Sequence, residues 1–208
     1  MDNFKLTTEQ INNNKESFLD LVRGITREFD KEKLINWLEK SDFFNAPASI
    51  KNQSSFDGGL CFHSLNVYAS LENLCANFAI DENGKALYSE DSIRIVALFH
   101  DLSKANYYEK FNRNVKNEIT GKWEQKEDYR IRDLSNRFIY GNREETSLYM
   151  VKSFIPNMTV EEEVAILNVL GGVGYDSAQT NLVDVYDKYG LACLLHVADT
   201  LSTFILKS

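Results

Sequence analysis

Apolar residues recur at three- and four-residue spacing along much of the chain, which is the period of an amphipathic helix. The pattern runs through the first 40 residues, with a break indicated at Gly24, and again from residue 58 to residue 84. Polar residues and Pro47 interrupt it between residues 41 and 56, where we expect a loop. The N-terminal part of the chain is therefore predicted to form helical segments on either side of this loop.

A short segment in the middle of the chain is apolar on nearly all sides. Ser89 and the two acidic residues after it are typical of a helix start, because the hydroxyl caps free backbone amides and acidic side chains are favoured in the first turn. Residues 93–103 then carry mostly aliphatic side chains, which indicates a helix buried in the core. His100 and Asp101 lie near the predicted end of this helix.

The pattern changes between residues 105 and 132, where aromatic and β-branched residues mix with charged ones. Residues 117–122 include a glycine and polar side chains and are expected to form a turn. We therefore predict a small β-hairpin in this part of the chain.

Three further helices are predicted in the C-terminal part. The first spans about residues 143–154, and the last spans about residues 184–205. The second begins at Thr159, which fits a capping box with Glu162, and ends near Gly171. Since no internal repeat, low-complexity stretch or domain boundary is evident, we expect residues 1–208 to form a single all-α domain with the hairpin as an insertion.

The composition is that of a globular protein. Hydrophobic residues make up 43% and charged residues 26% of the 208, which is enough for one sizeable core. No apolar run is long enough to span a bilayer, and the first residues do not resemble a secretion signal. The cysteines at 61, 75 and 193 lack the paired spacing of zinc ligands and are expected to be buried, reduced thiols. We therefore expect a cytoplasmic protein that does not act on a membrane.

The net charge of −8 argues against binding to long nucleic acid, because phosphate contacts need local positive charge. Residues 104–137 differ, with nine Lys/Arg against six Asp/Glu. Such mixed charge is usually a solvated surface, but this segment follows His100 and Asp101 directly and could form a wall of a substrate pocket. Basic residues could then meet phosphates and aromatic residues could stack on a base: Lys110, Arg113, Arg130 and Arg132 for the first, and Tyr107, Tyr108 or Trp123 for the second.

Four residues in apolar helical surroundings are candidates for a metal site: His63, His100, Asp101 and Asp199. Burying an unpaired carboxylate is costly, and a bound cation removes that cost. Imidazole nitrogen together with carboxylate oxygen suits Mn²⁺, Fe²⁺, Co²⁺, Ni²⁺ or Zn²⁺. Taken singly, each residue has a simpler explanation as a hydrogen-bonded core histidine or a helix-capping aspartate. The ordered set is what indicates a metal.

These residues, in the order His…His-Asp…Asp, resemble the motif of the HD-domain superfamily of metal-dependent phosphohydrolases. Residues 58–68, 97–104 and 196–199 carry the resemblance, which spans about residues 55–204. The chain looks similar to small HD-domain proteins of bacterial and phage genomes. Its Gly-Gly-Leu-x-x-His-Ser-Leu segment also resembles the HD domain of bacterial 3′–5′ exoribonucleases.

The resemblance implies an all-α bundle with the metal at its centre. The first 40 residues lie outside the matched region, and we expect helices within residues 1–45 to pack on this bundle. It implies His63, His100, Asp101 and Asp199 as ligands of a divalent ion, whether Mn, Fe, Co, Ni, Zn or Mg. The ion would acidify a bound water that attacks phosphorus, so that Asp101 takes part in catalysis. Lys104 follows one helical turn later and would contact a phosphate of the substrate.

Two departures from the family pattern reduce the implied metals from two to one. Many relatives carry further histidines, which bind a second metal, at the positions of Asn142 and Val169. An amide oxygen binds a metal weakly, and valine has no ligand atom. The remaining candidates for contacting the substrate or for orienting a ligand are Asn142, Glu145, His196 and Arg130.

The implied function is a metal-dependent phosphohydrolase that acts on a nucleotide or a related phosphoester. Two alternatives stay open. The loss of two histidines is also what a non-catalytic nucleotide-binding or partner-binding module would show. An exoribonuclease-like enzyme would instead bind short single-stranded RNA with a strong dependence on salt. The metal, the bond cleaved, the oligomeric state and the role of residues 1–40 are left open by the sequence.

Overall fold

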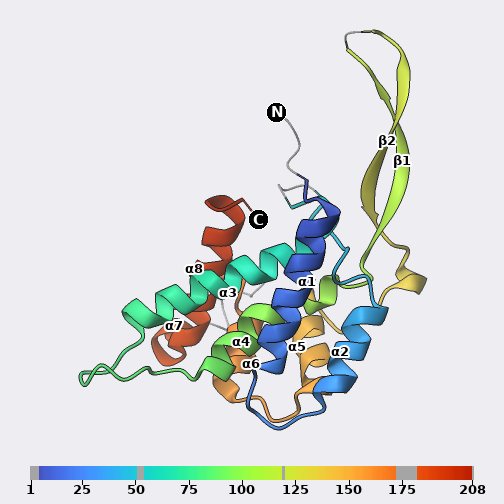
Figure 1. Ribbon diagram of the computed structural model, residues 1–208. Helices are drawn as coiled ribbons and strands as arrows, with labels where there is room; N and C mark the ends of the chain where they lie inside the picture. The colour runs from blue at the N-terminus through green and yellow to red at the C-terminus, as the bar shows by residue number, and fades with distance from the viewer. Residues whose placement is uncertain (1–4, 51–53, 119, 172–181, 208) are drawn as a thin grey trace.

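Helices make up most of the computed structural model, which describes residues 5–50, 54–118, 120–171 and 182–207 (Figure 1). The α-helices in these ranges are α1 (Thr8–Arg23), α2 (Lys31–Lys40), α3 (Gly59–Phe78), α4 (Glu90–Phe99), α5 (Arg143–Phe154), α6 (Val160–Leu167), α7 (Leu182–Lys188) and α8 (Gly190–Phe204). Short 3-10 helices are η1 (Leu102–Lys104) and η2 (Leu134–Asn136), and the strands are β1 (Tyr108–Lys116) and β2 (Trp123–Ile131). The prediction of a mainly helical fold with one small hairpin is confirmed.

Helix α4 forms the centre of the core, as the sequence predicts. It begins at Ser89, whose hydroxyl accepts a hydrogen bond from the amide of Ser92 at 3.1 Å. Its last five residues, 95–99, are fully buried, and it packs against α3, α6 and α1. The α-helix ends at Phe99, earlier than the predicted end at residue 103, and the chain continues through η1. This tighter 3-10 turn is common at helix C-termini, and it places the side chain of Lys104 beside Asp101.

The N-terminal helices share the core of the remaining chain. The ring of Phe18 in α1 contacts that of Phe99 at the end of α4, with centroids 5.8 Å apart. In α2 the ring of Trp37 lies 5.5 Å from that of Phe154 in α5. The first helix ends at Arg23, and Gly24, the predicted break, caps it. Both helices are therefore part of the same packed body, which Figure 1 shows beside α3, α4 and α5.

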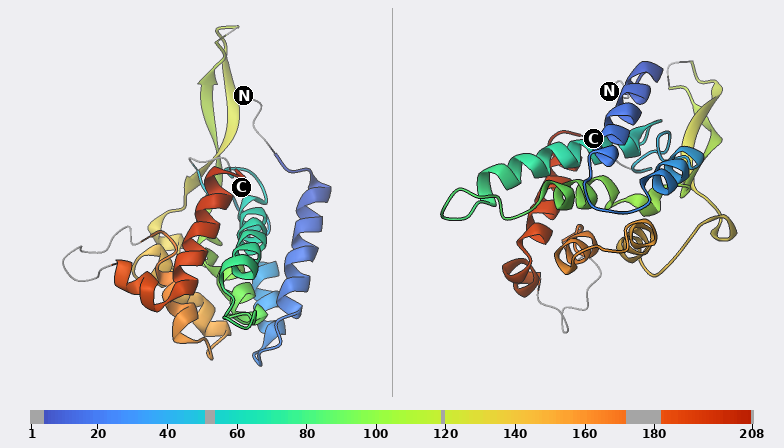
Figure 2. Two further views of the ribbon diagram at one scale, coloured as in Figure 1. Left: turned by 90° about the vertical axis from the view of Figure 1, so that its left-hand side faces the viewer. Right: turned by 60° about the horizontal axis from the view of Figure 1, so that its bottom comes forward.

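The hairpin projects from the helical body, as Figure 1 and the left view of Figure 2 show. Its strands pair antiparallel from Tyr108↔Ile131 at the base to Lys116↔Trp123 at the far end. At the base it is tied to the body by Arg132, which donates to Asp42 at 2.9 Å, and by Tyr129, which donates to Asp57. Nearly all of β2 is exposed. The predicted hairpin is confirmed, but most of its length lies away from the core.

The C-terminal region differs from the prediction in two places. The single helix expected over residues 184–205 is two helices, α7 and α8, which meet at Tyr189 and Gly190. Gly190 fits there because a Cβ atom would come 2.7 Å from the hydroxyl of Tyr88. In addition, α6 ends at Leu167 rather than near Gly171, which adopts a left-handed conformation with φ of 68°. No helix within the described ranges is long and apolar enough to cross a membrane.

Candidate metal centre

Three helical segments bring the four predicted ligands together. His63 lies in α3, Asp199 lies in α8, and His100 and Asp101 follow the last residue of α4. The nitrogen Nε2 of His63 is 3.0 Å from Oδ1 of Asp199 and 3.7 Å from Oδ2 of Asp101. The nitrogen Nε2 of His100 is 3.4 Å from Oδ2 of Asp101 and 3.7 Å from Oδ1 of Asp199. Residues that are 136 positions apart in sequence therefore point to one place.

The ring of His100 is oriented in the way a metal ligand needs. Its Nδ1 lies 2.8 Å from the carbonyl oxygen of Ala97. A carbonyl can only accept, so Nδ1 carries the proton and, in the neutral ring, Nε2 has a free lone pair. This Nε2 atom is buried without a hydrogen-bond partner and faces the oxygens of Asp101 and Asp199. A nitrogen lone pair and carboxylate oxygens that are 3.4–3.7 Å apart repel one another unless a cation lies between them. These residues are therefore suited to bind a metal ion.

The surroundings of the two carboxylates favour their ionised form, although both side chains are largely buried. Burial by itself disfavours the charge of Asp101, but the ammonium group of Lys104 holds the pKa of this carboxyl well below its usual range. Lys104 contributes through its ammonium group, which is 2.5 Å from Oδ2 of Asp101. Burial likewise opposes ionisation of Asp199, and the hydrogen bond with His63 lowers its pKa. The site therefore offers anionic oxygens, which hard and borderline divalent ions prefer.

The donor atoms most closely gathered are those of His63, His100 and Asp101, all within 4.8 Å of one another. Asp199 stands beside this group, with one oxygen near both imidazoles. The structure thus supports three close ligands and a fourth at the edge of the group.

A cavity of about 200 Å³ opens over these residues. Lys104 and Arg143 line it together with the four candidate ligands. Arg143, the first residue of α5, was missed by the sequence analysis. Burial would lower the pKa of its guanidinium, but the nearby carboxylate of Asp101 raises it. The only sequence signal for Arg143 is its place directly after Asn142, which the sequence analysis names as a candidate for contacting the substrate.

Asn142 and Glu145 form a capping box at the N-terminus of α5. The side-chain oxygen of Asn142 accepts from the amide of Glu145 at 2.8 Å, and the carboxylate of Glu145 accepts from the amide of Asn142 at 2.8 Å. This reciprocal capping box satisfies two free helix amides. The structure therefore gives both residues a capping role and places neither in the lining of the metal cavity.

His196 and Arg130 also lie outside the lining of this cavity. The Nδ1 atom of His196 donates to the carbonyl of Val169 at 2.7 Å, and the ring packs closely on Gly171. Val169 does line the cavity, so the hydrogen bond from His196 holds the backbone of a residue in the cavity wall. Arg130 is on the exposed hairpin, where it pairs with Glu109 at 2.7 Å.

The other basic residues of the hairpin do not form the expected wall of a substrate pocket. Lys110 is paired with Asp57 and Glu127, Arg113 with Asp128, and Arg132 with Asp42. None of them lines the metal cavity, and Trp123 lies at the far end of the hairpin. The described residues therefore do not support phosphate contacts by Lys110, Arg113, Arg130 and Arg132 or stacking by Trp123 at the metal cavity.

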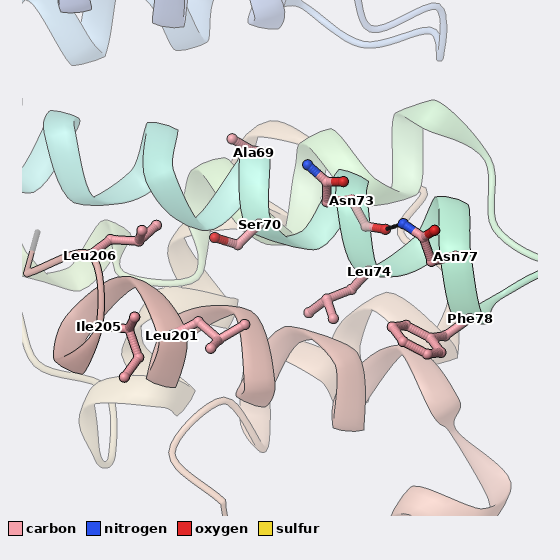
Figure 3. A pocket seen from close by; sticks show the side chains of 9 residues that line it. All are labelled: Ala69, Ser70, Asn73, Leu74, Asn77, Phe78, Leu201, Ile205 and Leu206. Carbon is pink, nitrogen blue, oxygen red and sulfur yellow. Dashed lines mark hydrogen bonds between the residues drawn. The ribbon is translucent and has the colours of Figure 1, made fainter.

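A larger hollow, of about 360 Å³, lies elsewhere, between α3 and α8 (Figure 3). Leu74 and Phe78 line it from α3, and Leu201 and Ile205 line it from the other side. The described residues around it include no acid, base or histidine. It has size but no group that could carry out chemistry, so the smaller cavity over His100 is the better candidate for an active site.

No family model, no curated protein and no solved structure matches the chain. The candidate metal site is therefore assigned from its geometry alone.

Proposed function

We propose that the chain is a metal-dependent phosphohydrolase that acts on a nucleotide or a related phosphoester, and that it resembles the HD-domain superfamily in function as well as in motif. The observation that carries the proposal is the buried Nε2 of His100, which has no hydrogen-bond partner among the described residues and faces the oxygens of Asp101 and Asp199. His63, His100, Asp101 and Asp199 would hold one divalent ion. When bound, such an ion supplies an acidified water and polarises a phosphoryl oxygen.

The charges around the cavity support an anionic substrate. The carboxylates of Asp101 and Asp199 are offset by the cationic side chains of Lys104 and Arg143. A divalent cation would then leave the cavity with excess positive charge, which favours a phosphate dianion. Lys104, already beside Asp101, would bind one phosphoryl oxygen, and the forked guanidinium of Arg143 could bind two.

Metal-loaded protein tests the proposal directly. The protein is incubated with Mn²⁺, Co²⁺, Ni²⁺, Zn²⁺ or Mg²⁺ and a panel of nucleotides and simple phosphoesters, and phosphate release is measured. We expect turnover that falls by roughly a hundredfold or more in Asp101→Asn and in Lys104→Gln, which remove a metal ligand and a phosphate contact. Lys110→Gln is the matched control, because Lys110 is a paired lysine on the hairpin. Its activity should equal that of the unmodified protein.

Two outcomes would contradict the proposal in different ways. If the protein binds metal and nucleotide but hydrolyses nothing in the panel, the non-catalytic binding module is the better description. If it binds no metal, the site itself is wrong. An exoribonuclease-like role gains no support from the basic residues expected to bind RNA phosphates, because Lys110, Arg113, Arg130 and Arg132 are paired with carboxylates.

A further inference from the structure

The arginines of this acidic protein fall into two groups. Six of the eight form a salt bridge with a carboxylate: Arg23, Arg27, Arg94, Arg113, Arg130 and Arg132. Arg137 and Arg143 form none with the described residues. In a chain with a net charge of −8, carboxylates are abundant, so two unpaired guanidinium groups need an explanation.

Both unpaired arginines line the same pocket. This pocket of about 150 Å³ lies beside the metal cavity, and Arg143 lines both spaces. Arg137 reaches the pocket from the segment before α5, after η2. The two arginines therefore give one pocket two positive charges, and Arg143 connects it to the metal cavity.

The position of Arg137 leaves its donors available to a ligand. Its guanidinium lies 4.9 Å from the centre of the ring of Tyr107, and this cation–π contact fixes its position without using an N–H group. Its Nε atom is buried and has no hydrogen-bond partner in the part of the chain that the structure describes. A buried donor without a partner is costly, and a bound oxygen anion would remove that cost.

The size and chemistry of the pocket favour a phosphoryl group over a base. It is smaller than the roughly 300–1,000 Å³ of sites that enclose whole drug-sized ligands, so it suits a single group. The forked guanidinium matches the oxygens of a phosphoryl group, which two arginines can hold at once. A base stacked on Tyr107 would have to displace Arg137 from the face that it covers.

We infer that the pocket of Arg137 and Arg143 is a second phosphoryl subsite, and that the substrate carries two linked phosphoryl groups, as a nucleoside diphosphate does. This inference rests on the proposed function for its catalytic part. The terminal phosphoryl group occupies the metal cavity, and the next one occupies the pocket, with Arg143 touching both. In hydrolysis, water adds its oxygen to the terminal phosphorus and the bridging P–O bond breaks. The bond's electron pair stays on the retained phosphoryl group, and one proton is released to solvent.

Binding of inorganic pyrophosphate and inorganic phosphate, measured by calorimetry on the full chain with Mn²⁺ present, tests the subsite without turnover of a nucleotide. We expect pyrophosphate to bind at least tenfold more tightly than phosphate, since it gains charge-assisted hydrogen bonds in the second subsite. Arg137→Gln should weaken pyrophosphate binding about tenfold or more and change phosphate binding less than about twofold. Arg143→Gln should weaken both, because Arg143 borders both spaces.

Arg130→Gln is the matched control, because it removes an exposed arginine that is paired on the hairpin. It should leave both affinities unchanged. A thermal melt of each variant verifies folding, and Arg137→Lys provides a second variant that keeps the charge but loses the fork. We expect Arg137→Lys to bind pyrophosphate with an affinity between those of the unmodified protein and Arg137→Gln.

The activity measurements separate this inference from the proposed function. With nucleoside mono- and diphosphates as substrates, Arg137→Gln should lower kcat/KM for the diphosphate about tenfold and spare the monophosphate. Equal pyrophosphate and phosphate affinities in the unmodified protein, or equal losses of both in Arg137→Gln, would overturn the second subsite. The phosphohydrolase would still stand if Asp101→Asn abolished turnover. Conversely, Arg137-dependent pyrophosphate binding without any turnover would support the subsite and overturn the enzyme.

Discussion

Glu162 and Arg27 form a buried, bidentate ion pair that joins α6 to the segment between α1 and α2. Two nitrogens of Arg27 donate to the two carboxylate oxygens of Glu162 at 2.6 and 2.7 Å. One of these oxygens also accepts from the amide of Thr159 at 2.9 Å, in the capping box of α6. The side chain of Glu162 is 0% exposed and that of Arg27 is 16% exposed. Removing the negative charge should therefore leave a poorly solvated arginine without its partner.

We predict that Glu162→Gln lowers the free energy of unfolding by about 3 kcal/mol, the lower end of the cost of breaking a buried pair from one side, because the amide keeps one acceptor. For a chain of this length the melting temperature should fall by roughly 6–12 °C. Glu145→Gln is the matched control, because Glu145 has the same place in an exposed capping box. Its cost should stay below about 1 kcal/mol.

Urea unfolding followed by circular dichroism measures both changes. Equal losses for the two variants, or a loss below about 1 kcal/mol for Glu162→Gln, would show that the cap matters and the buried pair does not.

The same ion pair predicts a dependence of stability on pH. Burial opposes ionisation of Glu162, but the hydrogen bonds from Arg27 lower the pKa of this carboxyl below its ordinary value of 4.5. A carboxyl whose pKa is lowered by folding stabilises the fold above its unfolded-state pKa, and this contribution is lost as the pH falls through the folded-state value. The stability difference between the unmodified protein and Glu162→Gln should therefore be constant near neutral pH and shrink on acidification below 4.5. Urea midpoints across a pH series measure it, and a difference that grows in acid would contradict this sign.

Three further predictions concern the site and its surroundings. Saturating Mn²⁺ or Zn²⁺ should raise the melting temperature by roughly 5–11 °C at a hundredfold excess over Kd; His100→Ala should lose this response and His196→Ala should keep it, as differential scanning fluorimetry would show. Gly59→Ala should cost about 1–3 kcal/mol because its Cβ would overlap the carbonyl oxygen of Ser54, whereas Gly24→Ala, whose nearest contact is 3.3 Å, should cost less in urea unfolding. Replacing the outer half of the β1–β2 hairpin by a short turn should leave the metal-induced shift in melting temperature unchanged, because no residue there lines the metal cavity.

The features that could be predicted from the sequence are those that local chemistry determines. Ser89 and Thr159 cap helices where they were expected to, because a cap depends on residues three positions away. The four ligands converge because each is a polar residue at an apolar helical position, and such a residue needs a partner inside the core.

The features that could not be predicted depend on contacts between distant parts of the chain. The apolar pattern continues across Tyr189 and Gly190, so it does not predict the break between α7 and α8. At this break the hydroxyl of Tyr88, which is distant in sequence, lies close to Gly190. Similarly, the sequence analysis names Asn142 and Glu145 as candidates for contacting the substrate. In the structure these two residues cap α5, and Arg143 between them lines the metal cavity. Sequence spacing gave no sign of which neighbour would face the cavity.

The basic segment 104–137 shows most clearly why the sequence alone does not predict a binding surface. A count of charges along the chain does not show which charged residues are paired in the folded structure. The segment has an excess of positive residues, yet Asp42 and Asp57, from outside it, neutralise part of that excess through Arg132 and Lys110. Near the metal cavity, two arginines form no salt bridge with the described residues. One of these, Arg137, belongs to the segment, and the other lies just beyond it. The segment thus contributes to the candidate site through its first and last residues, Lys104 and Arg137, while the hairpin between them does not.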